Sequence, residues 1–89
     1  MLINCQRHGQ QTAAIVCRHH IQIHDRAVGF IENSDDADDL QAWCDDCERM
    51  FVQEGGKTDD FRVFNDFAVV CVACYGDLRT RHQRAPGEA

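Results

Sequence analysis

The residues of this chain that could do chemistry are its six cysteines and the histidines beside them. They form four short pairs, which are Cys5-x2-His8, Cys17 with His19 or His20, Cys44-x2-Cys47 and Cys71-x2-Cys74. Two side chains at such spacing can face one ion from a tight turn, and four thiolate or imidazole ligands complete the tetrahedron that zinc prefers. The sequence therefore predicts structural zinc sites.

The two later pairs predict a site of four cysteines. Cys44-x2-Cys47 is followed after 23 residues by Cys71-x2-Cys74, a spacing close to that of zinc ribbons and treble clefs. One alternative is that these thiols are small core residues, since free cysteine is commonly buried. A thioredoxin-like redox pair is another, but the βαβ pattern that usually accompanies it is not apparent.

The first half of the chain predicts a second site from Cys5, His8, Cys17 and one further histidine. In an extended segment Cys17 and His19 point to the same face, whereas His20 could share an ion with Cys17 only if the chain turns as a knuckle does. We favour His19 and leave His20 open. We expect consecutive pairing, with the first four ligands on one ion and the four later cysteines on another. The protein should therefore bind two zinc ions, and one at minimum.

Isolated histidines and an acidic loop offer weaker candidates. His24 and His82 have no ligand-like neighbour, and we expect them to be surface or core residues. The stretch 33–39 is rich in aspartate but lacks the glycine and terminal glutamate of a calcium-binding EF-hand, so it is interpreted as a solvated loop.

The ordered ligand pairs resemble those of a group of small uncharacterised bacterial zinc-finger-like proteins. The likeness rests on Cys5-x2-His8-Gly9, Val16-Cys17-x-His19, Ala42-Trp43-Cys44-x2-Cys47 and Val70-Cys71-x2-Cys74-Tyr75, and it runs from Cys5 to about Arg81. The resemblance implies His19 rather than His20 as a ligand. It implies no particular activity.

The first twenty residues are also similar to the start of a B-box, in which a Cys-x2-His-Gly knuckle precedes another cysteine pair. The spacing then departs from that family, because the next cysteine after His20 is Cys44, whereas a B-box places further ligands within a few residues. The departure argues against both the fold and the interlaced ligand order of a B-box.

The length of 89 residues predicts one small domain over residues 1–83 and a flexible tail over 84–89. A domain of this size buries little surface, so we expect it to need additional cross-links such as metal ions or disulfides. The start, Met1 to Cys5, shows no secretory signal, and no apolar stretch approaches the roughly 20 residues that span a bilayer. We therefore expect a cytoplasmic protein with free thiols, and disulfide pairing is the lesser alternative.

The elements that must hold the ligands predict an α+β fold of treble-clef or zinc-ribbon type. A strand over 12–17 delivers Cys17, and a hairpin is expected from Ile21–His24 and Ala27–Ile31, with Gly29 marking a bulge or a close approach of the backbone. Helices are expected from Cys44 to Gly55, after an N-cap at Thr58, and from Val72 to Arg81. Trp43 is interpreted as an apolar cover between the two sites.

The function predicted from these residues is a structural zinc-binding module that interacts with another protein and is not an enzyme. Two closed spheres of four ligands leave no open position for a catalytic water. A nucleic-acid-associated finger, using Arg62, Arg79, Arg81 and Arg84 against phosphate, is an alternative that the net charge of −6 disfavours. The basic residues near the end, Arg79, Arg81, His82 and Arg84, are more typical of a solvated helix end. A redox-sensitive zinc switch is a further alternative. The sequence does not predict the oligomeric state.

Overall fold

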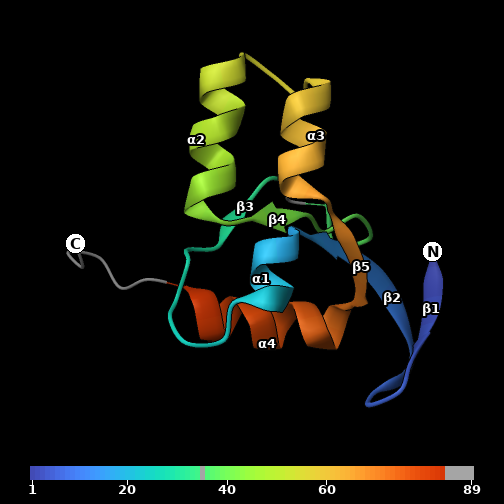
Figure 1. The fold of residues 1–89 in the computed structure, drawn as a ribbon. Helices are drawn as coiled ribbons and strands as arrows, with labels where there is room; N and C mark the ends of the chain where they lie inside the picture. The colour runs from blue at the N-terminus through green and yellow to red at the C-terminus, as the bar shows by residue number, and fades with distance from the viewer. Residues whose placement is uncertain (35, 84–89) are drawn as a thin grey trace.

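A computed structural model describes residues 1–34 and 36–83 of the chain, and the predicted tail over 84–89 lies outside the described residues. Its centre is a three-stranded antiparallel sheet in the order β1-β2-β5 (Figure 1), formed by β1 (Leu2–Cys5), β2 (Gly9–Val16) and β5 (Ala68–Cys71). Helices and a second, two-stranded sheet complete the fold, so the predicted α+β class is confirmed.

The hairpin between β1 and β2 forms the predicted knuckle. Its register pairs Cys5 with Gly9, so the chain reverses between the two ligands of the first pair. Gly9 adopts a φ of 74°, in the left-handed region that glycine enters without steric cost. The backbone therefore turns immediately after His8 and leaves along β2.

Three of the helices begin where the sequence predicts. Both Cys44 and Cys71 are N-caps, and Thr58 accepts a hydrogen bond from the backbone N–H of Phe61 at 3.2 Å. Gly55 ends the first of these helices with a φ of 73°. The helices are α2 (Asp45–Glu54), α3 (Asp59–Asn65) and α4 (Val72–His82). α2 and α3 stand side by side, and α4 lies below the short α1 (Figure 1).

The hairpin expected from Ile21–His24 and Ala27–Ile31 is wrong. The chain instead forms the helix α1 (Arg18–Gln22) directly after Cys17, and β3 (Ile31–Glu32) pairs with β4 (Ala42–Trp43). A four-residue alternation of apolar and polar side chains does not separate a strand from one turn of helix. The helical turn directs His20 inward, where it is fully buried, and leaves Ile21 38% exposed.

Apolar side chains form two small cores. The first includes Val16, Tyr75 and Leu78, and it holds α4 against β2. The second surrounds Trp43 and Phe61 together with three cysteines, so the thiols are part of the packing of α2 and α3. Within the described ranges, no helix combines the length and apolar character that crossing a membrane requires.

Candidate metal centres

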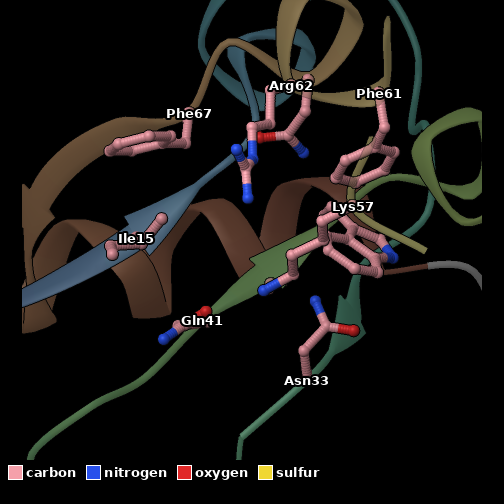
Figure 2. Close-up of a pocket in the computed structure, with 10 residues that line it drawn as sticks. Ile15, Asn33, Gln41, Lys57, Phe61, Arg62 and Phe67 are labelled. Atoms are coloured by element: carbon pink, nitrogen blue, oxygen red, sulfur yellow. The ribbon is translucent and has the colours of Figure 1, made fainter. Parts of the chain in front are cut away.

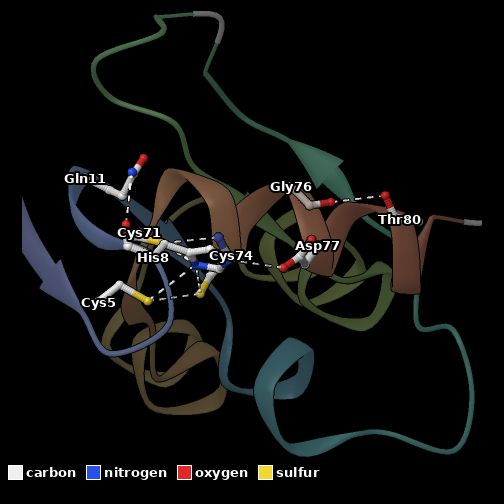
Figure 3. Close-up of polar contacts among 8 residues, drawn as sticks. All are labelled: Cys5, His8, Gln11, Cys71, Cys74, Gly76, Asp77 and Thr80. Atoms are coloured by element: carbon white, nitrogen blue, oxygen red, sulfur yellow. Dashed lines mark hydrogen bonds and ion pairs between the residues drawn. The ribbon is translucent and has the colours of Figure 1, made fainter.

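The first and last ligand pairs meet in one cluster, which we call centre 1. It contains Cys5, His8, Cys71 and Cys74. His8 Nδ1 lies 3.5, 3.3 and 3.5 Å from the sulfurs of Cys5, Cys71 and Cys74, and the sulfurs of Cys5 and Cys74 are 3.6 Å apart (Figure 3). All four donor atoms therefore converge on one point.

Strand pairing brings these distant pairs together. β5 runs antiparallel to β2, with Val16 opposite Ala68 and Ala13 opposite Cys71, so β5 runs toward the knuckle end of β2. α4 then begins at Cys71, whose Sγ accepts from the backbone N–H of Cys74 at 3.3 Å. Centre 1 thus combines a knuckle with the first turn of a helix, where the helix dipole favours negatively charged thiolates.

A carboxylate lies behind the imidazole of centre 1. His8 Nε2 is 3.9 Å from Oδ2 of Asp77, whereas Nδ1 faces the thiols (Figure 3). Metal-bound histidines commonly direct their second ring nitrogen toward such a group, which fixes the tautomer and the ring orientation. Asp77 was not among the predicted site residues, although its position three residues after Cys74 on a predicted helix places the two on one face.

The two inner pairs meet in centre 2, which contains Cys17, His19, Cys44 and Cys47. His19 Nδ1 lies 3.4 Å from the sulfur of Cys44 and 3.4 Å from that of Cys47. Cys44 is the N-cap of α2, and its Sγ accepts from the backbone N–H of Cys47 at 3.5 Å. Centre 2 therefore repeats the use of a helix start that centre 1 shows.

Two groups outside the ligand set support centre 2. Asn65, 7% exposed, donates from Nδ2 to the sulfur of Cys47 at 3.5 Å, and the ring of Phe64 lies 4.8 Å from that of His19. No signal in the sequence distinguishes Asn65 from other polar residues at a helix end. Its contact depends on how α3 packs against α2.

The donor spacing fits zinc. Metal–sulfur bonds of about 2.3 Å and metal–nitrogen bonds of about 2.0–2.1 Å place the ligand atoms of a tetrahedron roughly 3.5–3.8 Å apart. The distances between donor atoms in the two centres are 3.3–3.6 Å where the atoms are in contact, and all lie within 4.8 Å of one another. Both clusters could hold a metal ion, and the described residues include all six cysteines, none of which forms a disulfide.

The electrostatics of the thiols favour a cation in each centre. Hydrogen bonds from Cys44 and Cys47 lower the pKa of Cys17 to about 3, whereas hydrogen bonds with Cys17 and Cys44, together with burial, raise the pKa of Cys47. In centre 1, backbone hydrogen bonds from Arg7 and His8 lower the pKa of Cys5 to about 6, and burial raises that of Cys74 to about 12. One thiolate thus suppresses ionisation of its neighbours unless a positive ion lies among them.

The expected consecutive pairing of ligands is wrong, because the pairs are nested. Cys5 and His8 join Cys71 and Cys74 around Cys17, His19, Cys44 and Cys47. The reason is the length of β2, whose eight residues separate His8 from Cys17. At about 3.3 Å per residue that strand keeps the two pairs roughly 25–30 Å apart, too far to share an ion.

The histidines outside centre 1 differ in their surroundings. His19 lies among the thiols, whereas His20 donates from Nε2–H to the carbonyl of Gly29 at 2.8 Å, and its ring stacks 5.0 Å from that of His82. His20 and His82 are both fully buried, and burial is the main cause that lowers the pKa of each. His24 is exposed and lies 3.3 Å from Arg81.

Trp43 covers centre 2 and does not lie between the two centres. It packs in one cluster with Cys17, Cys44 and Cys47, and its ring lies 5.0 Å from that of Phe61. Its indole N–H donates to Glu48 at 2.8 Å. The predicted apolar cover therefore exists, but it protects the inner centre alone.

The acidic loop makes local turns. Asp36 accepts through Oδ1 from the N–H of Asp38 at 2.9 Å, and Ser34 accepts from the N–H of Asp36 at 3.2 Å. Neither candidate metal cluster includes a carboxylate of this loop, and Asp35 lies outside the described residues. The described part of the loop is thus stabilised by its own side chains.

Comparison of the chain with protein-family models, with curated proteins and with solved structures finds no significant match in any of the three. The resemblance to bacterial zinc-finger-like proteins therefore stays a prediction.

Proposed function

We propose that this chain is a protein-interaction module whose fold is held together by two structural zinc ions. The observation that carries the proposal is the nested pair of clusters, each with three cysteines and one histidine whose donor atoms lie within 4.8 Å of one another. Three thiolates and one imidazole are a ligand set typical of structural zinc. Soft thiolates also disfavour magnesium and calcium, which bind oxygen.

The position of the centres supports a structural role. Centre 1 joins β1 and β2 to the start of α4, and centre 2 joins the end of β2 to the start of α2. Small domains bury too little apolar surface to rely on a core alone, and structural zinc supplies apparent binding energies of about 10–16 kcal/mol in peptides. Each centre also has four protein ligands, so a bound ion keeps no position for a catalytic water.

The distribution of the arginines supports a protein partner over a nucleic acid. Arg79, one of the basic residues near the C-terminal end, lies 3.5 Å from Glu32. Arg81 contacts the ring of His24, and Arg84 lies outside the described residues. Glu32 thus offsets the charge of Arg79 in a chain whose net charge is already −6.

The proposal is tested on protein purified without added zinc. Native mass spectrometry should find two zinc ions per chain, and removal of both with a strong chelator should abolish the near-UV circular dichroism signal of Trp43. Readdition of zinc should restore that signal. Retention of the full signal after complete metal removal would contradict a structural role, and a metal-free, disulfide-bonded chain would contradict the zinc sites. Retention of DNA or RNA at about 50 mM salt would favour the nucleic-acid alternative.

A further inference from the structure

A pocket beside centre 2 has the chemistry of a peptide-binding site. It lies between β2, β4 and α3, has a volume of about 220 Å³, and has an apolar lining that includes Ile15, Trp43, Phe61 and Phe67. Figure 2 shows the rings of Phe67 and Phe61 at opposite sides of the pocket, with the side chain of Arg62 between them and that of Lys57 below Phe61. The pocket therefore combines aromatic walls with two cations.

The aromatic wall continues onto the exposed surface. Phe67 is 61% exposed and Val69, two residues further along, is 46% exposed. Residues two apart on an extended segment point to the same face, so these side chains extend the apolar lining outward. Contiguous apolar surface next to a pocket marks interaction sites more often than isolated exposed residues do.

The charge of the pocket is opposite to that of the molecule. The chain has fifteen carboxylates against nine lysines and arginines, yet the charged side chains lining this pocket are Lys57 and Arg62. Lys57 Nζ lies 5.8 Å from the ring centre of Trp43, and the contact of Arg62 with Asp59 is an exposed pair of 3.8 Å, which binds weakly. Both cations can therefore receive a carboxylate from a ligand.

A neighbouring hollow indicates where the negative group of a ligand should lie in the pocket. It shares Trp43 and Lys57 with the pocket but is lined on its other side by Asp39 and Glu48. Those carboxylates repel an anion, so the negative group of a ligand should lie near Arg62 and away from Glu48.

The size of the pocket favours a side chain over a free small molecule. Typical ligand pockets measure about 300–1,000 Å³, so 220 Å³ holds little more than one large side chain. We propose that this pocket binds an acidic peptide segment of a partner protein, with one large apolar side chain against Ile15 and Phe67 and an adjacent carboxylate at Arg62 and Lys57. The inference rests on the proposed function, because it identifies the surface of that interaction module.

The test uses the full chain with two zinc ions confirmed by mass. The probe is the peptide acetyl-Gly-Asp-Phe-Asp-Gly-amide, added at up to millimolar concentration while ¹⁵N–¹H NMR spectra are recorded. We expect saturable shifts of the Trp43 indole and of the amides of Lys57, Arg62 and Phe67. Replacing both aspartates of the peptide with asparagine should weaken binding about threefold to tenfold, and replacing its phenylalanine with alanine should weaken it at least as much.

Variants of the protein test the same site from the other side. Arg62→Glu combined with Lys57→Glu should reduce affinity for the acidic peptide by about tenfold or more, with two zinc ions still bound. Arg26→Glu is the matched control, because Arg26 is exposed and is not part of the pocket lining, and it should leave affinity unchanged.

Several results would overturn the inference. Equal affinity for the aspartate and asparagine peptides would do so, and this comparison needs only the unaltered protein if the double variant does not fold. Peptide shifts confined to other surfaces, or a twelve-nucleotide DNA strand that shifts these amides when the peptide does not, would also overturn it. If the peptide does not bind to a chain that holds two zinc ions, this inference fails and the metal centres stand. If the chain holds no zinc, the proposed function itself is contradicted.

Discussion

Ile15 and Gln41 form a single parallel β-bridge two residues before Cys17 and three residues before Cys44. Because the two segments run in the same direction from this bridge, both cysteines reach the same end of the sheet region. The antiparallel pairing of β5 with β2 directs Cys71 to the opposite end. These two pairings of opposite sense produce the nested centres.

The two centres should release metal at different rates. Three ligands of centre 1, Cys5, His8 and Cys74, are partly exposed, whereas all three cysteines of centre 2 are at most 1% exposed. A chelator reaches centre 1 more easily, so zinc release should be biphasic, with centre 1 faster by about tenfold or more. The measurement is chelator-dependent release in wild type and in Cys5→Ser, which should lack the fast phase. Loss of the slow phase in that variant would contradict the assignment.

Asp77→Asn should weaken metal binding at centre 1. The substitution removes the negative charge that faces His8 Nε2 at 3.9 Å, and loss of such partners costs about 10–100-fold in metal affinity. Because Asp77 is 57% exposed, we expect about tenfold, measured by competition with a chromophoric chelator. Asp59→Asn is the control, since Asp59 is fully exposed and belongs to neither centre. Equal affinity for wild type and Asp77→Asn would show that Asp77 does not orient His8.

Gly29→Ala should destabilise the zinc-bound protein. Gly29 has a φ of 88°, and a Cβ there would lie 2.1 Å from the carboxylate of Asp45. The left-handed backbone should lower the free energy of unfolding by about 1–3 kcal/mol, and the Asp45 carboxylate must move to admit the methyl group. Gly76→Ala, within α4, meets nothing within 4 Å and should raise that free energy by about 0.5–1 kcal/mol. Denaturant unfolding of both variants gives the comparison, and similar effects of the two substitutions would refute the proposed close approach.

His82 should make the fold sensitive to mild acid. Burial lowers the pKa of His82, and the ring of His20 and the guanidinium of Arg81 lower it further. In the unfolded chain His82 binds a proton near pH 6.5, whereas in the folded chain it binds that proton only at lower pH. This part of the stability is therefore complete above about pH 6.5 and falls by up to about 1.4 kcal/mol per pH unit below it, until the folded pKa is reached.

The comparison that isolates His82 uses His82→Gln. Protonation of the metal ligands also lowers stability in acid, but it is common to wild type and variant, so only their difference is interpreted. The variant should lose less unfolding free energy than wild type between pH 7 and pH 5. His24→Gln, at an exposed histidine, should behave as wild type. If His82→Gln and wild type lose stability in parallel, burial of His82 does not produce the acid sensitivity.

The sequence predicted the local parts of the fold because local chemistry determines them. The knuckle at Gly9, the N-cap at Thr58 and the end of α2 at Gly55 each depend on a few adjacent residues. The helical turn that replaces the expected strand at Ile21 was missed because a short alternation is compatible with both.

The pairing of the ligands was predicted incorrectly because it depends on strand register. Nothing in the sequence specifies that Ala13 lies opposite Cys71 or that Ile15 bridges to Gln41. One local signal did oppose consecutive sites, since a strand leading into Cys17 separates that residue from His8. The contact of Asn65 with Cys47 and the pocket beside Trp43 arise from the packing of α3, which no spacing of residues encodes.

The nested arrangement is tested most directly by replacing zinc with ¹¹³Cd and recording ¹¹³Cd–¹H correlation spectra. One cadmium resonance should couple to the β-protons of Cys5, Cys71 and Cys74, and the other to those of Cys17, Cys44 and Cys47. Couplings to the rings of His8 and His19 should divide between the two resonances in the same way. A single resonance coupled to both Cys44 and Cys71 would contradict the account.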